Sequence, residues 1–134
     1  MKRSPSSQPR VHRVVIAEDN LDQVHSLSFM LKEMGHSVDF AINGYVAYDV
    51  VRRFRPDTVI LDLGLPGVTG YEVATQIKRD PELAGTRLVA LTAYEDDKYR
   101  ARAKEVGFDV YFVKPLSYQD LETLFGDSKD AFVR

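Results

Sequence analysis

The feature of this sequence that most restricts its fold is a regular alternation of short apolar runs with helical patterns. Five runs have the length and residue types of β-strands: 14–17, 37–41, 58–61, 88–91 and 110–113. Each run precedes a segment with helical spacing or capping signals, at about 21–34, 45–54, 71–79, 96–106 and 117–125. Because strands that alternate with helices pair in parallel, we predict a doubly wound α/β domain. Its five-stranded parallel sheet should be covered by helices on both faces.

Local signals refine this prediction. The 58–61 run is nearly all apolar, which is typical of a central strand, whereas the 37–41 run is more polar and is expected at an edge. Asp19 or Asn20 can cap the first helix, and Gly35 follows its last turn. We expect Asn43 and Gly44 to form a turn.

Composition limits the possible classes of protein. The chain has 134 residues, no cysteine and a formal net charge of −2, which indicates one domain without disulfides, thiolate zinc sites or iron–sulfur clusters. Residues 1–13 hold four basic and no acidic side chains, so the remainder holds 14 basic and 20 acidic ones. We predict a basic, flexible N-terminal arm at 1–11, one domain at 12–126 and a short tail at 127–134. We expect a cytoplasmic protein with neither a membrane span nor a direct nucleic-acid contact.

Polar side chains follow four of the five predicted strands. Glu18 and Asp19 follow the first, Asp62 the third, Thr92 the fourth and Lys114 the fifth. Ligands bind beyond the carboxyl ends of the strands in such sheets, so these side chains should converge at one edge. Two ionised carboxylates about 4 Å apart repel by roughly 4 kcal/mol at an effective dielectric constant near 20. A divalent cation, best matched by Mg²⁺, offsets this repulsion and suits phosphoryl chemistry with Asp62 as the nucleophile.

Four segments together resemble the receiver domains of two-component response regulators, over about residues 12–126. They are Ile-Ala-Glu18-Asp19-Asn, Leu-Asp62-Leu-Gly-Leu-Pro66-Gly-Val-Thr-Gly70-Tyr, Leu-Thr92-Ala93-Tyr and Tyr111-Phe-Val-Lys114-Pro115. The resemblance extends to chemotaxis regulators and to the receivers of hybrid histidine kinases, and it implies the strand order 2-1-3-4-5. It also implies a signalling domain of a phosphorelay that catalyses only its own phosphorylation and dephosphorylation.

The resemblance implies a role for each acidic position. Asp62 would accept a phosphoryl group from a phosphohistidine, carried by a partner histidine kinase or histidine phosphotransfer domain. Glu18, Asp19 and Asp62 would hold Mg²⁺ together with the backbone carbonyl of Gly64, and Mn²⁺ could replace Mg²⁺. The phosphoacceptor reaction would therefore depend on a metal.

The resemblance also implies which residues act as the switch and which faces bind partner proteins. Thr92 and Lys114 would complete the catalytic group, and Tyr111 would rotate inward behind Thr92 as a switch. The output face, made of the fourth helix, fifth strand and fifth helix, would bind a downstream protein or a second copy of the chain. The donor would dock on the first helix and on the loop after the fifth strand, near Val24, Leu27, Ser28 and Pro115.

Three other classes of protein share parts of this pattern. A pseudo-receiver binds partners without being phosphorylated, but here every position of the acidic site is filled. An aspartate-nucleophile phosphatase needs a second acid two residues after the nucleophile, where this chain has Gly64. A flavodoxin-like nucleotide binder needs a phosphate-binding loop after the first strand, where Glu18 and Asp19 would repel phosphate.

Overall fold

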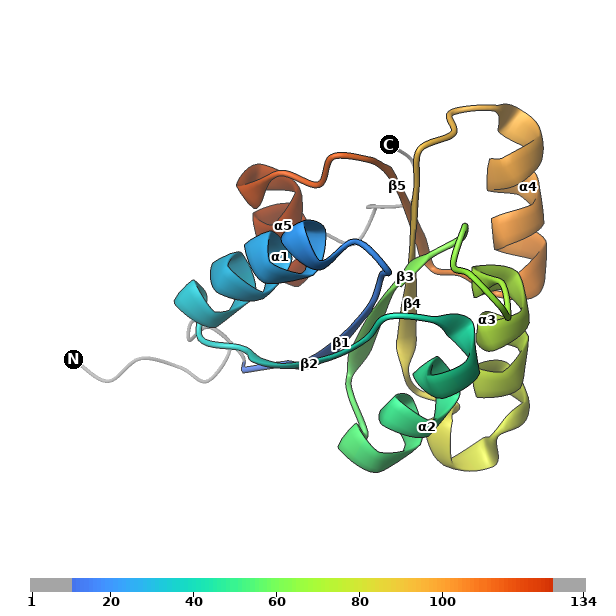
Figure 1. Cartoon of the computed structure of the whole chain (residues 1–134), viewed down its shortest axis with the longest axis horizontal. Helices are drawn as coiled ribbons and strands as arrows, with labels where there is room; N and C mark the ends of the chain where they lie inside the picture. Colours follow the sequence, from blue (N-terminus) through green and yellow to red (C-terminus); the bar gives the residue numbers. More distant parts are fainter. Residues whose placement is uncertain (1–10, 127–134) are drawn as a thin grey trace.

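Five parallel strands form one twisted sheet in the computed structural model, which describes residues 11–126 (Figure 1). The strands are β1 (Arg13–Ala17), β2 (Ser37–Ala41), β3 (Thr58–Asp62), β4 (Arg87–Thr92) and β5 (Val110–Val113). They lie in the order β2-β1-β3-β4-β5, and every neighbouring pair is parallel. The predicted sheet, the central position of β3 and the edge position of β2 are therefore confirmed.

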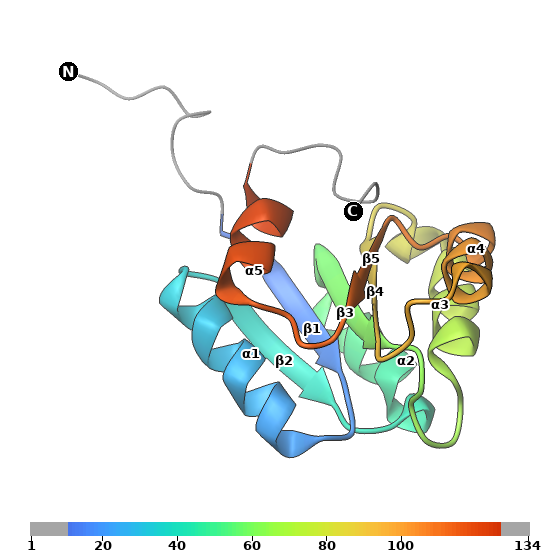
Figure 2. The ribbon, with the colours of Figure 1, turned by 90° about the horizontal axis from the view of Figure 1, so that it is seen from above.

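Helices cover both faces of the sheet (Figures 1 and 2). They are α1 (Leu21–Glu33), α2 (Gly44–Phe54), α3 (Gly70–Arg79), α4 (Asp97–Val106) and α5 (Tyr118–Phe125), with a short 3₁₀ turn, η2 (Pro81–Leu83), after α3. Helices α1 and α5 pack on one face, and α2, α3 and α4 pack on the other. This is the predicted doubly wound arrangement, and η2 is an element that the sequence patterns did not indicate.

Alternate residues of each strand contribute to two separate apolar cores. In β1, Val14 and Ile16 pack on the side of α1 and α5, whereas Val15 packs on the side of α2 and α3. In β5, Phe112 joins the first core and Tyr111 the second. Successive strand side chains point to opposite faces, so a strand covered on both sides must be apolar at nearly every position.

The ends of two helices sharpen the local predictions. Asn20 is the N-cap of α1, and Gly35 beyond its other end has a φ of 94°, as expected for a helix terminator. The prediction of a turn at Asn43 and Gly44 is wrong, because Asn43 caps α2 and Gly44 is its first residue. A Cβ on Gly44 would overlap the carbonyl of Val68, so α2 begins in close contact with the β3–α3 loop.

The predicted arm and tail lie outside the described residues, apart from Val11 at the start of the described part. Within residues 11–126, none of the helices combines the length and the apolar character that crossing a membrane requires. The peptide bond between Lys114 and Pro115 is cis.

Candidate functional site

The predicted site residues meet at the carboxyl edge of the sheet. Asp62 is the last residue of β3, and Thr92 is the last residue of β4. Glu18 directly follows β1, and Lys114 directly follows β5. Because the four strands are neighbours and run in one direction, their ends bring these side chains together, as predicted.

Three carboxylates form the acidic part of the site. One oxygen from each of Glu18, Asp19 and Asp62 lies within 4.8 Å of the other two. Glu18 and Asp62 are buried, at 1% and 6% exposure, whereas Asp19 is exposed. Because Asn20 rather than Asp19 caps α1, capping does not account for the position of the Asp19 carboxylate.

Lys114 balances part of this negative charge. Its Nζ lies 2.7 Å from Oε1 of Glu18 and 3.3 Å from Oδ2 of Asp62. Burial alone would lower the pKa of Lys114, but the hydrogen bond with Glu18 and the charge of Asp62 raise it above its usual value. One ammonium beside three carboxylates leaves a formal charge of −2 when all four groups are ionised.

Backbone N–H groups orient the two buried carboxylates. Gly64 N–H donates to Oδ1 of Asp62 at 2.9 Å, and Asn20 N–H donates to Oε2 of Glu18 at 3.1 Å. Burial raises the pKa of Glu18 above its usual value, and its hydrogen bonds with Lys114 and Asn20 act against that rise. Both carboxylates are therefore held in place by main-chain donors from the loop or helix that follows their own strand.

Gly70 allows α3 to begin directly behind the end of β3. A Cβ on Gly70 would lie 2.4 Å from the backbone carbonyl oxygen of Asp62 and 2.7 Å from Cα of Leu63. These neighbours are main-chain atoms that cannot move aside, so a side chain here would displace the end of β3. The sequence motif contained this glycine, but its contact with Asp62 is visible only in three dimensions.

Thr92 and Tyr111 are connected through the backbone of Tyr94. The hydroxyl of Thr92 accepts a hydrogen bond from Tyr94 N–H at 3.1 Å, and the hydroxyl of Tyr111 donates to the Tyr94 carbonyl at 2.8 Å. The ring of Tyr111 already lies inward, with 1% exposure. Burial raises the pKa of Tyr111, and the nearby Arg100 guanidinium acts in the opposite direction.

Comparison with known proteins identifies the family that this geometry belongs to. A family model described as the response regulator receiver domain matches residues 14–125, which include the whole acidic site. This chain belongs to that family. Receiver domains are signalling domains, and this one contains an acidic cluster of Glu18, Asp19 and Asp62.

Two curated relatives support the assignment. PilH of Pseudomonas aeruginosa is 30% identical over 112 residues, covering 84% of this chain and 90% of PilH. The probable transcriptional regulatory protein SilR of Salmonella typhimurium is 33% identical over 109 residues, covering 81% of this chain and 47% of SilR. This receiver therefore spans most of PilH but about half the length of SilR.

Solved structures have the same fold. The chemotaxis protein CheY4 of Vibrio cholerae superposes with a TM-score of 0.80 at 25% identity, covering 86% of this chain and 97% of CheY4. The receiver domain of sensor histidine kinase PA1611 from Pseudomonas aeruginosa PAO1, described with a magnesium ion coordinated in its active site cleft, has a TM-score of 0.78. It is 24% identical, covers 87% of this chain and 95% of that domain, and supports the fold alone.

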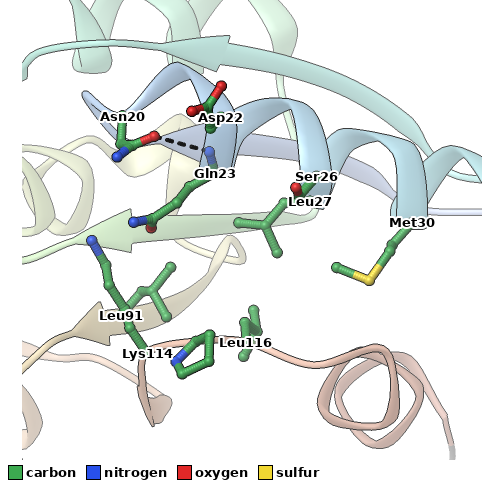
Figure 3. Close-up of a pocket in the computed structure, with 10 residues that line it drawn as sticks. Asn20, Asp22, Gln23, Ser26, Leu27, Met30, Leu91, Lys114 and Leu116 are labelled. Atoms are coloured by element: carbon green, nitrogen blue, oxygen red, sulfur yellow. Dashed lines mark hydrogen bonds between the residues drawn. The ribbon is translucent and has the colours of Figure 1, made fainter.

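A groove beside the acidic site runs between α1 and the segment after β5 in this receiver (Figure 3). Its volume is about 290 Å³, and Lys114 extends along it toward the start of α1. The residues that line it are Asn20, Asp22, Gln23, Ser26, Leu27, Met30, Leu91, Lys114, Pro115 and Leu116. The predicted docking residues Leu27 and Pro115 lie here, but Val24 is fully buried, so its prediction as a surface contact is wrong.

Proposed function

We propose that this receiver is a phosphoacceptor in two-component signal transduction, and that Asp62 takes a phosphoryl group from a phosphohistidine. The observation that carries the proposal is the placement of Asp62 at the end of the central strand, within 4.8 Å of two further carboxylate ligands and 3.3 Å from the Lys114 ammonium. A nucleophilic carboxylate, a cation site and a fixed ammonium are the parts that phosphoryl transfer requires.

The donor atoms of the site fit Mg²⁺. Carboxylate oxygens of Glu18, Asp19 and Asp62 are the hard ligands that this cation prefers, and the backbone carbonyl of Gly64 is proposed as a further ligand. When bound, the cation supplies positive charge that neutralises the oxygens of the transferring phosphoryl group. Mn²⁺ has the same ligand preference and is proposed as a substitute.

The proposed reaction forms one bond and breaks one bond. A carboxylate oxygen of Asp62 attacks phosphorus while the bond between phosphorus and the donor imidazole nitrogen breaks. The nitrogen leaves with the electron pair, and because the other ring nitrogen of the donor carries a proton before transfer, the leaving group is neutral imidazole. Asp62 becomes a mixed carboxylic–phosphoric anhydride. Lys114 interacts with the phosphoryl oxygens as a point charge, and the Thr92 hydroxyl can donate to another of them.

The groove provides a place for the donor domain. Lys114 lines it, and Leu27, Met30 and Leu116 contribute apolar side chains to its lining (Figure 3). A helix that carries a phosphohistidine could cover this apolar strip while its imidazole reaches Asp62. The proposed partners are a histidine kinase or a histidine phosphotransfer domain, and the cytoplasm is the proposed location of the reaction.

The output surface is proposed on the flank formed by α4, β5 and α5. Tyr118 on α5 is 45% exposed there, and Tyr111 of β5 connects this flank with Thr92. A downstream protein or a second copy of the chain would bind this face. Residues 12–126 are proposed as the functional unit.

The experiment is incubation with acetyl phosphate and Mg²⁺ followed by intact-mass measurement. We expect a gain of one phosphoryl group, which is lost in Asp62→Asn and in the presence of EDTA. Asp49→Asn is the matched control, because Asp49 is an exposed carboxylate on α2 away from the acidic site. A folded wild-type chain that gains no mass would contradict the proposal and favour a pseudo-receiver. Release of many phosphates per chain would favour an aspartate-nucleophile phosphatase.

A further inference from the structure

Helix α4 is attached to the domain differently from α1. Among the described residues, Ala103 is the one buried side chain of α4, whereas α1 buries Val24, Leu27 and Leu31. Asp96 is the N-cap residue of α4, and its side chain makes no capping hydrogen bond with the described residues. Apolar burial and capping are the usual sources of helix stability, so α4 depends on other contacts to hold its place.

Arg100 supplies one of these contacts. Its guanidinium carbon lies 4.5 Å from the centre of the Tyr111 ring, which is within the range of a cation–π interaction. Tyr111 comes from β5, and its hydroxyl donates to the carbonyl of Tyr94 at 2.8 Å. The inward ring is therefore held at its tip by a carbonyl and on its face by a cation from α4.

Arg102 makes a similar contact with a different tyrosine. Its guanidinium carbon lies 4.0 Å from the centre of the Tyr71 ring, and the Tyr71 hydroxyl donates to the carbonyl of Tyr99 at 3.4 Å. Tyr71 belongs to the first turn of α3 and not to β5. The two arginines lie two positions apart on one helix and differ in the tyrosine that they cover, so each is a control for the other.

The Arg100 contact continues toward the acceptor site. Tyr94 N–H donates to the Thr92 hydroxyl at 3.1 Å, and the carbonyl of the same residue accepts from Tyr111. These contacts run without a break from Thr92 through the Tyr94 backbone and the Tyr111 ring to Arg100. Arg102 lies over Tyr71 and not over Tyr111, and the Tyr71 hydroxyl donates to the carbonyl of Tyr99 in α4 itself.

We propose that Arg100 is a positioning residue that keeps the Tyr111 ring inward and thereby joins α4 to the Thr92 side of the site. A shift of Thr92 or Tyr94 is then passed to Arg100 and to the exposed side of α4. This transmission rests on the proposed phosphorylation of Asp62, whereas the hold of Arg100 on Tyr111 does not. A cation–π contact at a partly exposed site changes the ratio of inward to outward ring by about 2- to 5-fold.

The test follows the Tyr111 ring by NMR in protein carrying ¹³C-labelled tyrosine, with Tyr111→Phe used to assign its signal. A neutral paramagnetic agent in solution reports the exposure of each ring. We expect Arg100→Leu to increase the agent-induced relaxation of the Tyr111 signal by about 2- to 5-fold, and Arg100→Lys to reverse part of that increase. Arg102→Leu should affect Tyr71 and leave the Tyr111 signal unchanged.

Two results would overturn the positioning role. One is an unchanged Tyr111 signal in folded Arg100→Leu protein, and the other is an equal change of the Tyr111 signal in Arg102→Leu.

A second experiment adds acetyl phosphate and Mg²⁺, and we expect the amide signals of α4 to shift less in phosphorylated Arg100→Leu than in phosphorylated wild type. Equal shifts would overturn the transmission. A wild-type chain that takes up no phosphoryl group would contradict the proposed function of Asp62, but the first experiment would still decide the hold on Tyr111.

Discussion

The two edges of the sheet use the same acidic residue types in opposite ways. At the amino edge, Asp57 and Asp109 directly precede β3 and β5, and each accepts a backbone hydrogen bond from a neighbouring strand. Asp57 Oδ2 accepts from Arg13 N–H at 2.8 Å, and Asp109 Oδ2 accepts from Leu88 N–H at 2.9 Å. Each of these two carboxylates therefore stabilises the amino edge separately, through one hydrogen bond to a neighbouring strand.

At the carboxyl edge, acidic side chains gather instead of being dispersed. Glu18, Asp19 and Asp62 bring oxygens within 4.8 Å of one another, and Lys114 is the ammonium that contacts two of them. Repulsion among these carboxylates opposes folding, and a bound cation relieves it. From this difference we infer that the amino edge is arranged for stability and the carboxyl edge for ligand binding. The following substitutions test this separation.

The largest effect on stability is expected for Lys114→Met, which removes the ammonium from the carboxyl edge. It leaves Glu18, which is 1% exposed, beside Asp62 without a balancing charge. Removing one partner of a buried ion pair typically lowers the free energy of unfolding by several kcal/mol. Because the Lys114 side chain is 19% exposed, we expect a loss of about 2–3 kcal/mol. The measurement is urea unfolding at neutral pH in EDTA.

Lys32→Met is the control for this change, since Lys32 is an exposed lysine in the last turn of α1. Lys32→Met should lower the free energy of unfolding by less than about 0.5 kcal/mol. Equal effects of the two substitutions would show that the charge balance at the carboxyl edge contributes nothing particular to stability.

The second prediction concerns the cation itself. Mg²⁺ at ten times its dissociation constant should raise the free energy of unfolding of the wild type by about 1.4 kcal/mol, because it binds the folded state alone. Asp19→Asn should lose most of this gain, and Asp57→Asn at the amino edge should keep it. Thermal unfolding with and without Mg²⁺ measures the difference. A gain that survives Asp19→Asn would exclude Asp19 as a ligand.

Much of the fold and of the acidic site could be predicted from the sequence, because both depend on local order. A buried parallel strand must be apolar on both faces, so β3 is visible as an apolar run. The residues that follow such runs must meet at one edge, which is why Glu18, Asp62 and Lys114 could be grouped before their distances were known.

Features that depend on contacts between distant segments could not be predicted in this way. Asn43 and Gly44 have the composition of a turn, but the close contact of Gly44 with Val68 makes them the start of α2. Val24 lies on α1, yet the apolar spacing does not show which side of the helix borders the groove. Arg100 has the pattern of an exposed position, and only the packing of α4 on β5 brings it over Tyr111.

The third prediction concerns the two carboxylate hydrogen bonds at the amino edge. Asp57→Ala and Asp109→Ala should each lower the free energy of unfolding by about 1 kcal/mol, since each loses a charge-assisted hydrogen bond, exposed at Asp57 and part-buried at Asp109. The two effects should add, because the two side chains accept from different strands, β1 and β4. Phosphoryl uptake should remain at the wild-type level in both variants. A loss of uptake in either folded variant would contradict the separation between the two edges.

The smallest effect is expected from His36, which is 7% exposed at the amino edge. Its Nδ1 accepts the backbone N–H of His12 at 3.0 Å, so this nitrogen carries no proton in the folded state. Burial, and then the nearby His12 ring, lower the pKa of His36 below 6.5. Phe125 contacts both imidazole rings, carries Arg87 over its own ring, and offers no negative charge to an imidazolium.

The sign of the pH effect follows from the lowered pKa of His36. The unfolded chain binds the proton more readily, so the stabilising contribution of neutral His36 is complete above pH 6.5 and is lost as the pH falls through the folded-state pKa. His36→Asn keeps an acceptor near the Nδ1 position but does not titrate, so its stability should fall less than that of the wild type on acidification. His25→Asn, on the exposed side of α1, should retain the wild-type pH dependence. Urea unfolding between about pH 5 and 8 measures the three proteins. Parallel curves for His36→Asn and the wild type would show that the amino edge carries no proton-linked stability at this position.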